Sequence, residues 1–279
     1  MFVGGVDIGS TTAKAVILKD DQIILGTILR VTTKPERTAE LAMDEALKNA
    51  GLSSVDQLDF VVSTGYGRQK TQFAQENVSE ISCHARGAWF VLPSVRTIVD
   101  IGGQDCKSMS VTEKGTVSSF EMNDRCAAGT GRFFDVMAKV LTCGYDGISS
   151  LANVSETPAH ITNQCSVFAE SEVISLVNND VPLRDIITGI NLSVAGRAGG
   201  LLRRVGLKPD VVMTGGCSKN EGLIHALEKA LGVTIRKLPI DPQFMGAVGA
   251  AVFARDKATA KKGVPLAAPP AAELGHGTV

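Results

Sequence analysis

The apolar positions of the first part of the chain predict short buried strands around one amphipathic helix. Phe2 to Ile8 is a β-rich run that enters a turn of small polar residues, and apolar character resumes from Ala13 to Leu18. This pattern predicts two strands joined by a tight hairpin turn. The next expected elements are a strand within Ile23 to Val31, a helix over Glu36 to Ala50 that Gly51 ends, and a strand at Phe60 to Ser63.

The pattern then starts again near Thr97. Thr97 to Ile101 predicts a buried strand, the turn Gly102-Gly103-Gln104 follows it, and Cys106 to Val111 and Gly115 to Met122 complete a second antiparallel set. The two openings match at Asp7-Ile8-Gly9 and Asp100-Ile101-Gly102, where an acid at the end of a strand precedes a glycine turn. Such an internal duplication predicts an α/β fold of two related domains facing a common cleft.

The rest of the chain reads as helices with one strand. Apolar faces predict helices through Phe133 to Val140 and through Val167 to Val177. Further expected elements are helices at Leu183 to Val205, Asn220 to Leu231 and Phe244 to Ala254, and a strand at Val211 to Met213. We expect domains at residues 1–94 and 95–244, with a last helix, 245–260, packing back on the first domain. Residues 261–279 are rich in Ala, Pro, Gly and Lys and are expected to form a flexible tail.

Composition excludes several function classes. The 279 residues are 44% hydrophobic with a formal net charge of -1, which suits a substantial core and provides no basic field for nucleic acid or an anionic membrane surface. The N-terminus lacks a signal peptide pattern, and no apolar run reaches membrane-spanning length, so a cytoplasmic protein is expected. Its six cysteines are therefore read as core filler, metal ligands or redox groups instead of disulfides.

Three glycine-bearing turns each follow a predicted strand, at Gly9, at Gly102-Gly103 and at Gly215-Gly216. Glycine lets main-chain N–H groups approach a phosphate closely. One such turn is most simply a hairpin, whereas three in this order favour a nucleotide site. No P-loop or dinucleotide-binding fingerprint follows a strand. The side chains expected to assist are hydroxyls from Ser10, Thr11 and Thr12, a charge from Lys14, and Asp7 and Asp100, which would hold Mg²⁺ through its water ligands.

This arrangement resembles the actin-like ATPase superfamily of acetate kinase, sugar kinases, heat-shock chaperones and actin. The resemblance implies that the first two turns grip the phosphates. It also implies that the third turn, from Thr214 through Gly215 and Gly216 to Asn220, contacts the adenosine, which Gln243, Phe244 and Gly246 would border. Gln104, with Asp7 and Asp100, forms the expected catalytic set. Because an amide orients water but is no general base, Gln104 favours slow hydrolysis over phosphoryl transfer to a substrate.

Two cysteines add a second chemistry. Cys126 and Cys165 each stand where a helix is expected to start, and helix-start N–H groups and the helix dipole lower a thiol's pKa and stabilise an anionic iron–sulfur centre. The other cysteines are read as packing: Cys106 in a strand, Cys143 at a helix end and Cys217 in the third glycine turn. Cys83 is also read as packing, because it and its neighbour His84 would point apart on a helix.

Strings of sequence around these features carry a narrower resemblance and together span nearly all of residues 3 to 255. They are Asp7-Ile8-Gly9-Ser10-Thr11, Thr64-Gly65-Tyr66-Gly67-Arg68, Glu80-Ile81-Ser82-Cys83-His84-Ala85, Asp100-Ile101-Gly102-Gly103-Gln104-Asp105, Asn123-Asp124-Arg125-Cys126-Ala127-Ala128-Gly129-Thr130-Gly131-Arg132-Phe133 and Val167-Phe168-Ala169-Glu170-Ser171-Glu172-Val173. With them the chain resembles the ATP-dependent activators, or archerases, of 2-hydroxyacyl-CoA dehydratases. That family also contains the ATP-binding subunits of benzoyl-CoA reductase.

The resemblance implies a homodimer that shares one 4Fe-4S cluster, with Cys126 and Cys165 as the ligands from each chain. ATP-driven domain movement would then send one electron to an iron–sulfur dehydratase or reductase acting on a CoA thioester. A ferredoxin or flavodoxin would be the donor, in an anaerobic metabolism. Three alternatives stay open at this point: a subunit of a benzoyl-CoA or double-cubane-cluster reductase, a sugar or acid kinase without a cluster, and a structural actin-like ATPase.

Overall fold

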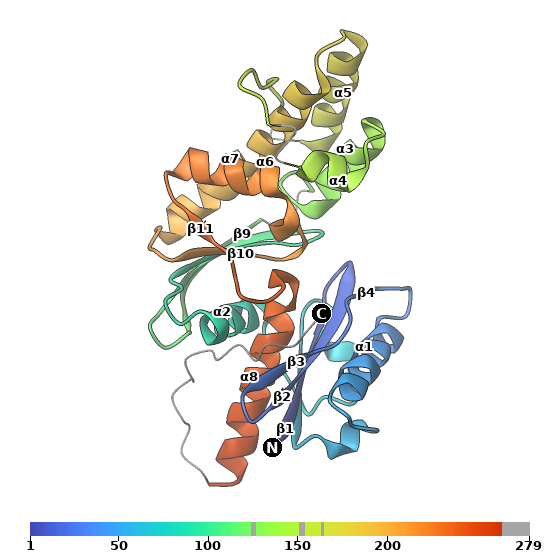
Figure 1. The fold of residues 1–279 in the computed structure, drawn as a ribbon, viewed down its shortest axis with the longest axis vertical. Coiled ribbons are helices and arrows are strands. Elements are labelled where there is room, and N and C mark those ends of the chain that lie inside the picture. Colours follow the sequence, from blue (N-terminus) through green and yellow to red (C-terminus); the bar gives the residue numbers. More distant parts are fainter. Residues whose placement is uncertain (124–126, 151–153, 163–164, 264–279) are drawn as a thin grey trace. The chain divides into compact units, whose positions relative to one another are not determined.

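The structure is a computed structural model that describes residues 1–123, 127–150, 154–162 and 165–263 (Figure 1). The chain divides into two compact units. The first comprises Met1–Val95, Val111–Ser118 and Leu238–Val279, and the second comprises Arg96–Ser110 and Ser119–Lys237. Each unit is a sheet covered by helices.

The first unit contains a six-stranded sheet among its described residues. Its strands are β1 (Phe2–Ile8), β2 (Thr12–Lys19), β3 (Gln22–Leu25), β4 (Leu29–Arg30), β5 (Phe60–Thr64) and β6 (Glu76–Asn77). They are ordered β3-β2-β1-β5-β6, with β4 beside β2. The central strand β1 pairs antiparallel with β2 and parallel with β5. It is almost entirely buried, as expected of a strand with helices over both faces.

Helices α1 (Pro35–Asn49) and α8 (Met245–Lys261) pack on this sheet, and α2 (Glu80–Val91) packs against α8. The apolar stripe of α1 lies against β1 and β2, and its chain turns away at Gly51, where φ is +71°. On α8, glycines permit unusually close packing: a Cβ at Gly249 would overlap the carbonyl of Cys83 on α2. A Cβ at Gly5 of β1 would likewise overlap the α8 backbone at Ala247. Helices α2 and α8 accordingly lie side by side (Figure 1).

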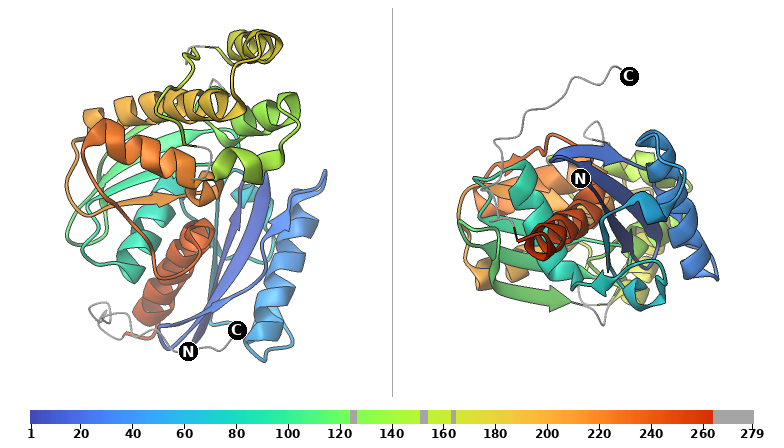
Figure 2. Two further views of the ribbon diagram at one scale, coloured as in Figure 1. Left: turned by 45° about the horizontal axis from the view of Figure 1, so that its top comes forward. Right: turned by 90° about the horizontal axis from the view of Figure 1, so that it is seen from below.

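The second unit repeats this plan. Its strands are β7 (Thr97–Ile101), β8 (Cys106–Val111), β9 (Val117–Asn123), β10 (Val211–Thr214) and β11 (Ile235–Arg236). They are ordered β11-β10-β7-β8-β9, with β7 antiparallel to β8 and parallel to β10. Its helices are α3 (Gly131–Val140), α4 (Gly144–Ser149), α5 (Ser166–Asn178), α6 (Leu183–Val205) and α7 (Glu221–Leu231). Helices α6 and α7 pack side by side over this sheet (Figure 2).

The duplication extends to individual residues. Asp7 stands opposite Lys14 in the β1–β2 register, and Asp100 stands opposite Lys107 in the β7–β8 register. On the parallel side, Asp7 is paired with Thr64 and Asp100 with Thr214. The glycine that follows each threonine has a positive φ, +87° at Gly65 and +81° at Gly215, which residues with a Cβ rarely adopt. The predicted internal repeat is therefore confirmed in the topology and in the register.

Several predicted elements need correction. The expected strand within residues 23–31 is two short strands, β3 and β4, and the short elements α4 and β11 were not predicted. Helix α8 continues past Ala254 to Lys261. The predicted domains, 1–94 and 95–244, stay a prediction, and the compact units differ from them in placing residues 111–118 and 238–244 in the first unit. The predicted tail lies, from residue 264 on, outside the described residues.

In the described part of the chain, no helix is both long enough and apolar enough to cross a bilayer.

Candidate nucleotide-binding turns and cysteine positions

The first glycine turn, Gly9 to Thr12, joins β1 to β2. Gly9 N–H donates to Thr12 O at 3.0 Å, which closes the turn. Gly67 N–H donates to Ile8 O at 2.9 Å and fixes the end of β1 from the other side. Ser10 and Thr12 are partly exposed and Thr11 is exposed. The predicted hydroxyl donors therefore lie together at one accessible turn, beside the end of a buried strand.

Asp7, next to this turn, is buried at 1% exposure and forms an ion pair with Lys14. Lys14 Nζ lies 2.7 Å from Asp7 Oδ2. The other oxygen, Oδ1, is buried and has no hydrogen-bond partner among the described residues. The ammonium of Lys14 is therefore buried and held by Asp7, and its predicted role toward the phosphates stays a prediction. The unsatisfied Oδ1 is the atom expected of a carboxylate that accepts hydrogen bonds from metal-bound water.

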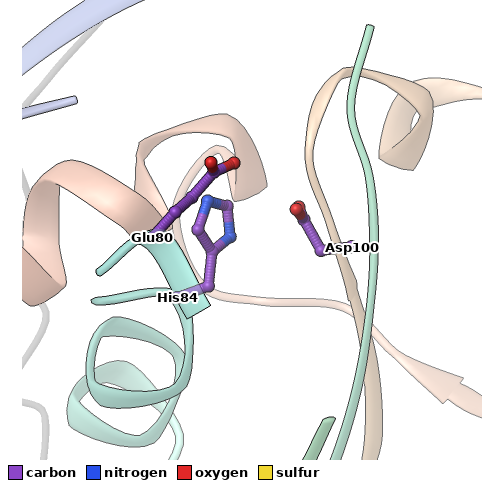
Figure 3. A group of neighbouring side chains, drawn as sticks. All are labelled: Glu80, His84 and Asp100. Carbon is purple, nitrogen blue, oxygen red and sulfur yellow. The ribbon is translucent and has the colours of Figure 1, made fainter. Parts of the chain in front are cut away.

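One further side chain of the first unit, His84 on α2, lies near this carboxylate. Glu80 and His84 are one turn apart on α2 and stand on the same side of it (Figure 3). A Cβ placed on Gly246 of α8 would lie 2.7 Å from Asp7 Oδ2 and 3.0 Å from His84 Nε2. Sequence reasoning missed His84, which is buried at 4% exposure. Its spacing of four residues from Glu80 was the available signal.

Asp100, the equivalent acid of the second unit (also labelled in Figure 3), is held more completely. Thr214 Oγ1 donates to Asp100 Oδ1 at 2.8 Å. Lys107 Nζ lies 3.5 Å from Asp100 Oδ2 and 2.8 Å from Asp105 Oδ2. Thr64, the counterpart of Thr214, donates instead to Val78 O at 2.9 Å. The two units thus share the acid, lysine, threonine and glycine but differ in how the acid is satisfied.

The second glycine turn, Gly102 to Gln104, joins β7 to β8. Gly102 N–H donates to Asp105 O at 3.0 Å, and Gln104 is exposed at the tip. The turn carbonyls are occupied by helix α3: Gly131 N–H donates to Gly102 O at 2.8 Å, and Arg132 N–H donates to Gly103 O at 2.9 Å. This turn is therefore pinned to the start of α3.

The third glycine turn, Gly215-Gly216, follows β10. A Cβ on Gly215 would lie 2.8 Å from Asp100 Oδ1, so the structure brings the second and third turns together around Asp100. Gly216 is exposed, which fits a ligand-facing position. Asn220 is fully buried: its Oδ1 accepts from Leu223 N–H at 2.9 Å and its Nδ2 donates to Asn191 Oδ1 at 3.0 Å. The Asn220 side chain therefore caps α7, and the predicted contact of this turn with the adenosine stays a prediction.

Gln243 and Phe244 belong to the first unit, in the short helix Pro242–Phe244 that precedes α8. Asp241 Oδ1 accepts from Gln243 N–H at 3.0 Å and caps this turn. Phe244 is only 5% exposed, so its ring serves mainly as core packing. Gln243 is partly exposed, and its predicted nucleotide contact stays a prediction.

The cysteines separate into two groups. Cys165 is the N-cap residue of α5, is partly exposed, and makes no capping hydrogen bond through its side chain. Its predicted helix-start position is confirmed. Cys126 lies outside the described residues, and α3 begins only at Gly131, so the sequence placed that helix start about one turn too early.

The thiols read as packing behave accordingly. Cys83, Cys106 and Cys217 are almost completely buried. Burial raises the pKa of Cys83 and of Cys217 to about 12, and it raises the pKa of Cys106 as well. Cys143 is partly exposed at the N-cap of α4, and partial burial raises its pKa. A buried thiol that stays protonated is a poor metal ligand, so Cys83, Cys106 and Cys217 fit the packing role expected of them.

Comparisons with known proteins agree with this geometry. The model of the BadF/BadG/BcrA/BcrD ATPase family matches residues 5–254. The activator of lactoyl-CoA dehydratase from Anaerotignum propionicum is 46% identical over 265 residues, which cover 94% of this chain and 100% of that protein. One of the subunits of benzoyl-CoA reductase from Thauera aromatica is 32% identical, covering 89% of this chain and 92% of that protein.

Solved structures of similar proteins share the fold of this chain. Component A of (R)-2-hydroxyglutaryl-CoA dehydratase from Acidaminococcus fermentans superposes with a TM-score of 0.88 at 44% identity, covering 93% of this chain and 99% of that one. The activator of 2-hydroxyisocaproyl-CoA dehydratase from Clostridium difficile, with bound ADPNP, gives 0.86 at 39% identity, covering 96% and 100%. A hexokinase from Thermus thermophilus gives 0.51 at 13% identity, covering 92% and 99%. The actin-like ATPase fold predicted from the sequence is therefore confirmed.

Proposed function

The chain belongs to the BadF/BadG/BcrA/BcrD ATPase family, and on this premise we propose that it is an ATP-hydrolysing activator of a 2-hydroxyacyl-CoA dehydratase. The support is the match to dehydratase activators along nearly the whole of both chains. ATP would be the energy source, and the product would be an electron delivered to a partner enzyme at low potential.

In this proposal the glycine turns bind the nucleotide. Main-chain N–H groups of the first two turns would receive the phosphates, and the third turn would approach the adenosine. The buried carboxylate of Asp7 keeps one oxygen unsatisfied, which suits it to a water of the Mg²⁺ shell, and Asp100 is the corresponding group of the second unit. Gln104, exposed at the tip of the second turn, would orient the attacking water without removing its proton.

The observation that carries the redox part is the accessible thiol of Cys165 at the start of α5. The unpaired N–H groups of a helix start favour an anionic ligand there. With Cys126 it would give two thiolates per chain, and two copies related by a two-fold axis would give the four that a 4Fe-4S cluster takes. When bound, such a cluster supplies one-electron transfer. The chain's own contribution is to present the thiolates and to change their setting with the nucleotide.

The relatives support the substrate class of the proposed acceptor, a dehydratase acting on a CoA thioester. An iron–sulfur centre in that acceptor, and a ferredoxin or flavodoxin as the donor, are what the resemblance in sequence implies. Because one relative belongs to a benzoyl-CoA reductase, a permanent reductase subunit is the second candidate. Purification from the native host separates the two: a free homodimer supports the activator, and a fixed hetero-oligomer supports the reductase assembly.

Reconstitution tests the activator directly. The full-length protein, prepared without oxygen, should activate a 2-hydroxyacyl-CoA dehydratase only with ATP, Mg²⁺ and a low-potential reductant. A kinase of the same fold would instead phosphorylate a small hydroxyl or acid substrate and contain no iron. Finding such a phosphorylated product from iron-free protein would refute the proposal.

A further inference from the structure

The start of α3 and the second glycine turn complete each other's hydrogen bonding. The first N–H groups of an α-helix have no acceptor within the helix. In α3, the first two of these N–H groups, on Gly131 and Arg132, donate to Gly102 O at 2.8 Å and to Gly103 O at 2.9 Å. The helix start and the tight turn thus satisfy one another's hydrogen-bonding groups.

These two bonds set the direction of the turn's own N–H groups. A trans peptide is planar, and its C=O and N–H point in opposite directions. The carbonyl of Gly102 shares a peptide with the N–H of Gly103, and the carbonyl of Gly103 shares one with the N–H of Gln104. Since both carbonyls point at α3, both N–H groups point away from it. Neither N–H has a backbone hydrogen-bond acceptor among the described residues.

We infer that Gly131 and Arg132 are positioning residues for the nucleotide: the start of α3 holds the second glycine turn in the orientation that presents two N–H groups to a phosphate. The inference rests on the proposed nucleotide site and names the residues that shape it. Hydrogen bonds in series also polarise one another, so a phosphate bound to the turn strengthens the bonds to α3, and α3 strengthens the grip on the phosphate.

Core packing fixes the position of α3, the helix that holds the second glycine turn. Phe133, Phe134 and Met137 are fully or almost fully buried in the core of the second unit. At Gly131 the fit is close: a Cβ there would lie 3.1 Å from Gly102 O and 3.3 Å from Gly103 Cα. A Cβ at this position would therefore push the turn away from the helix by a few tenths of an ångström.

The start of α3 is also connected along the chain to the residue that follows Cys126. Ala127 directly follows Cys126 in sequence, and Ala127 O accepts from Thr130 N–H at 3.1 Å and from Thr130 Oγ1 at 2.7 Å. One tight turn thus joins the residue after Cys126 to the helix start that holds the nucleotide turn. Nucleotide binding at Gly102 to Gln104 would therefore change the hydrogen bonding of the turn from Ala127 to Thr130.

The test compares Gly131→Ala with Gly200→Ala in the anaerobically prepared full-length protein. Both add one methyl group to a helical glycine of the second unit, but a Cβ at Gly200 meets nothing within 4 Å. We expect Gly131→Ala to raise the Kd for ADPNP about tenfold by calorimetry, the loss of roughly one good hydrogen bond, and Gly200→Ala to leave it within about twofold. If the Gly131→Ala protein binds ADPNP as tightly as the wild type, this inference is overturned while the proposed function stands.

A second measurement needs no variant. Saturating ADPNP should slow amide hydrogen exchange in the wild-type peptide covering residues 127–136, because it strengthens the bonds from Gly131 and Arg132. Unchanged exchange in that peptide, with ADPNP demonstrably bound, would refute the inference. Wild-type protein that fails to bind ADPNP at all would instead refute the proposed function.

Discussion

Lys14 Nζ lies 2.7 Å from Asp7 Oδ2 in a buried ion pair, while Asp7 Oδ1 has no hydrogen-bond partner among the described residues. One oxygen therefore stabilises the fold, and the other is left for a ligand. In the second unit, Thr214 satisfies the equivalent oxygen of Asp100. Among the described residues, Asp7 therefore keeps one acceptor oxygen without a partner, whereas the corresponding oxygen of Asp100 is occupied.

The two roles of Asp7 can be separated by substitution. Asp7→Asn should lower ATP hydrolysis about a hundredfold, because the charge that orients metal-bound water is gone. It should also cost about 3 kcal/mol of stability, since Lys14 is left buried and unpaired. Urea unfolding and phosphate release measure the two effects.

The matched control for this prediction is the double variant Asp7→Asn with Lys14→Met. Removing the unpaired charge should restore most of the stability but none of the hydrolysis. If hydrolysis returned with stability, the carboxylate would have only a structural role.

Cys165 and Cys143 offer a second matched pair, because each is a partly exposed N-cap residue without a side-chain capping bond. Cys165→Ser should remove the iron bound by anaerobically prepared protein, since a hydroxyl is a poor cluster ligand. Cys143→Ser should keep it. Iron analysis and the visible absorption spectrum check both, and equal iron in both variants would contradict the assignment of Cys165.

Buried thiols should make the protein sensitive to alkali. Cys83 has a pKa raised by burial from 9.0 to about 12, so above about pH 9 the unfolded chain loses this proton before the folded one does. Stability is therefore fully present below pH 9 and falls as the pH rises, by about 1.4 kcal/mol per pH unit for this thiol. Urea unfolding at about pH 8 and pH 10 should show a smaller loss in Cys83→Ala than in the wild type. Equal losses in both would count against a buried thiol at this position.

Close helix packing in the first unit gives a fourth prediction. Gly249→Ala should destabilise this unit by about 3 kcal/mol, because the new methyl group overlaps the carbonyl of Cys83. Trp89, the chain's single tryptophan, lies buried on α2 and reports unfolding of this unit by fluorescence. Gly200→Ala, with open space around its methyl group, should leave the transition unchanged. A Gly249→Ala midpoint equal to the wild type would mean that α2 and α8 are not packed this closely.

The features predicted well from the sequence are those fixed by local chemistry. The strand Thr97–Ile101 was bounded correctly because its apolar run ends at glycine, and helix Leu183–Val205 because its apolar face is continuous. Short elements such as α4 and β11 carry too few residues for any periodicity to stand out.

The side-chain partners could not be predicted in this way. Lys14 is seven residues from Asp7, and only the hairpin register shows that they are directly opposite. Asn220 stands beside a glycine turn in sequence, yet its side chain caps α7 and bonds to Asn191 on α6. These contacts depend on how distant elements pack, which the local pattern does not contain.

The central claim is that two chains hold one cluster that ATP makes reducing. Native mass spectrometry of anaerobically prepared protein tests it most directly, because it counts chains and cluster atoms in one species. The account predicts a dimer of intact chains carrying the mass of a single 4Fe-4S cluster, which Cys165→Ser abolishes. A wild-type dimer without iron, or a monomer that carries a complete cluster by itself, would contradict it.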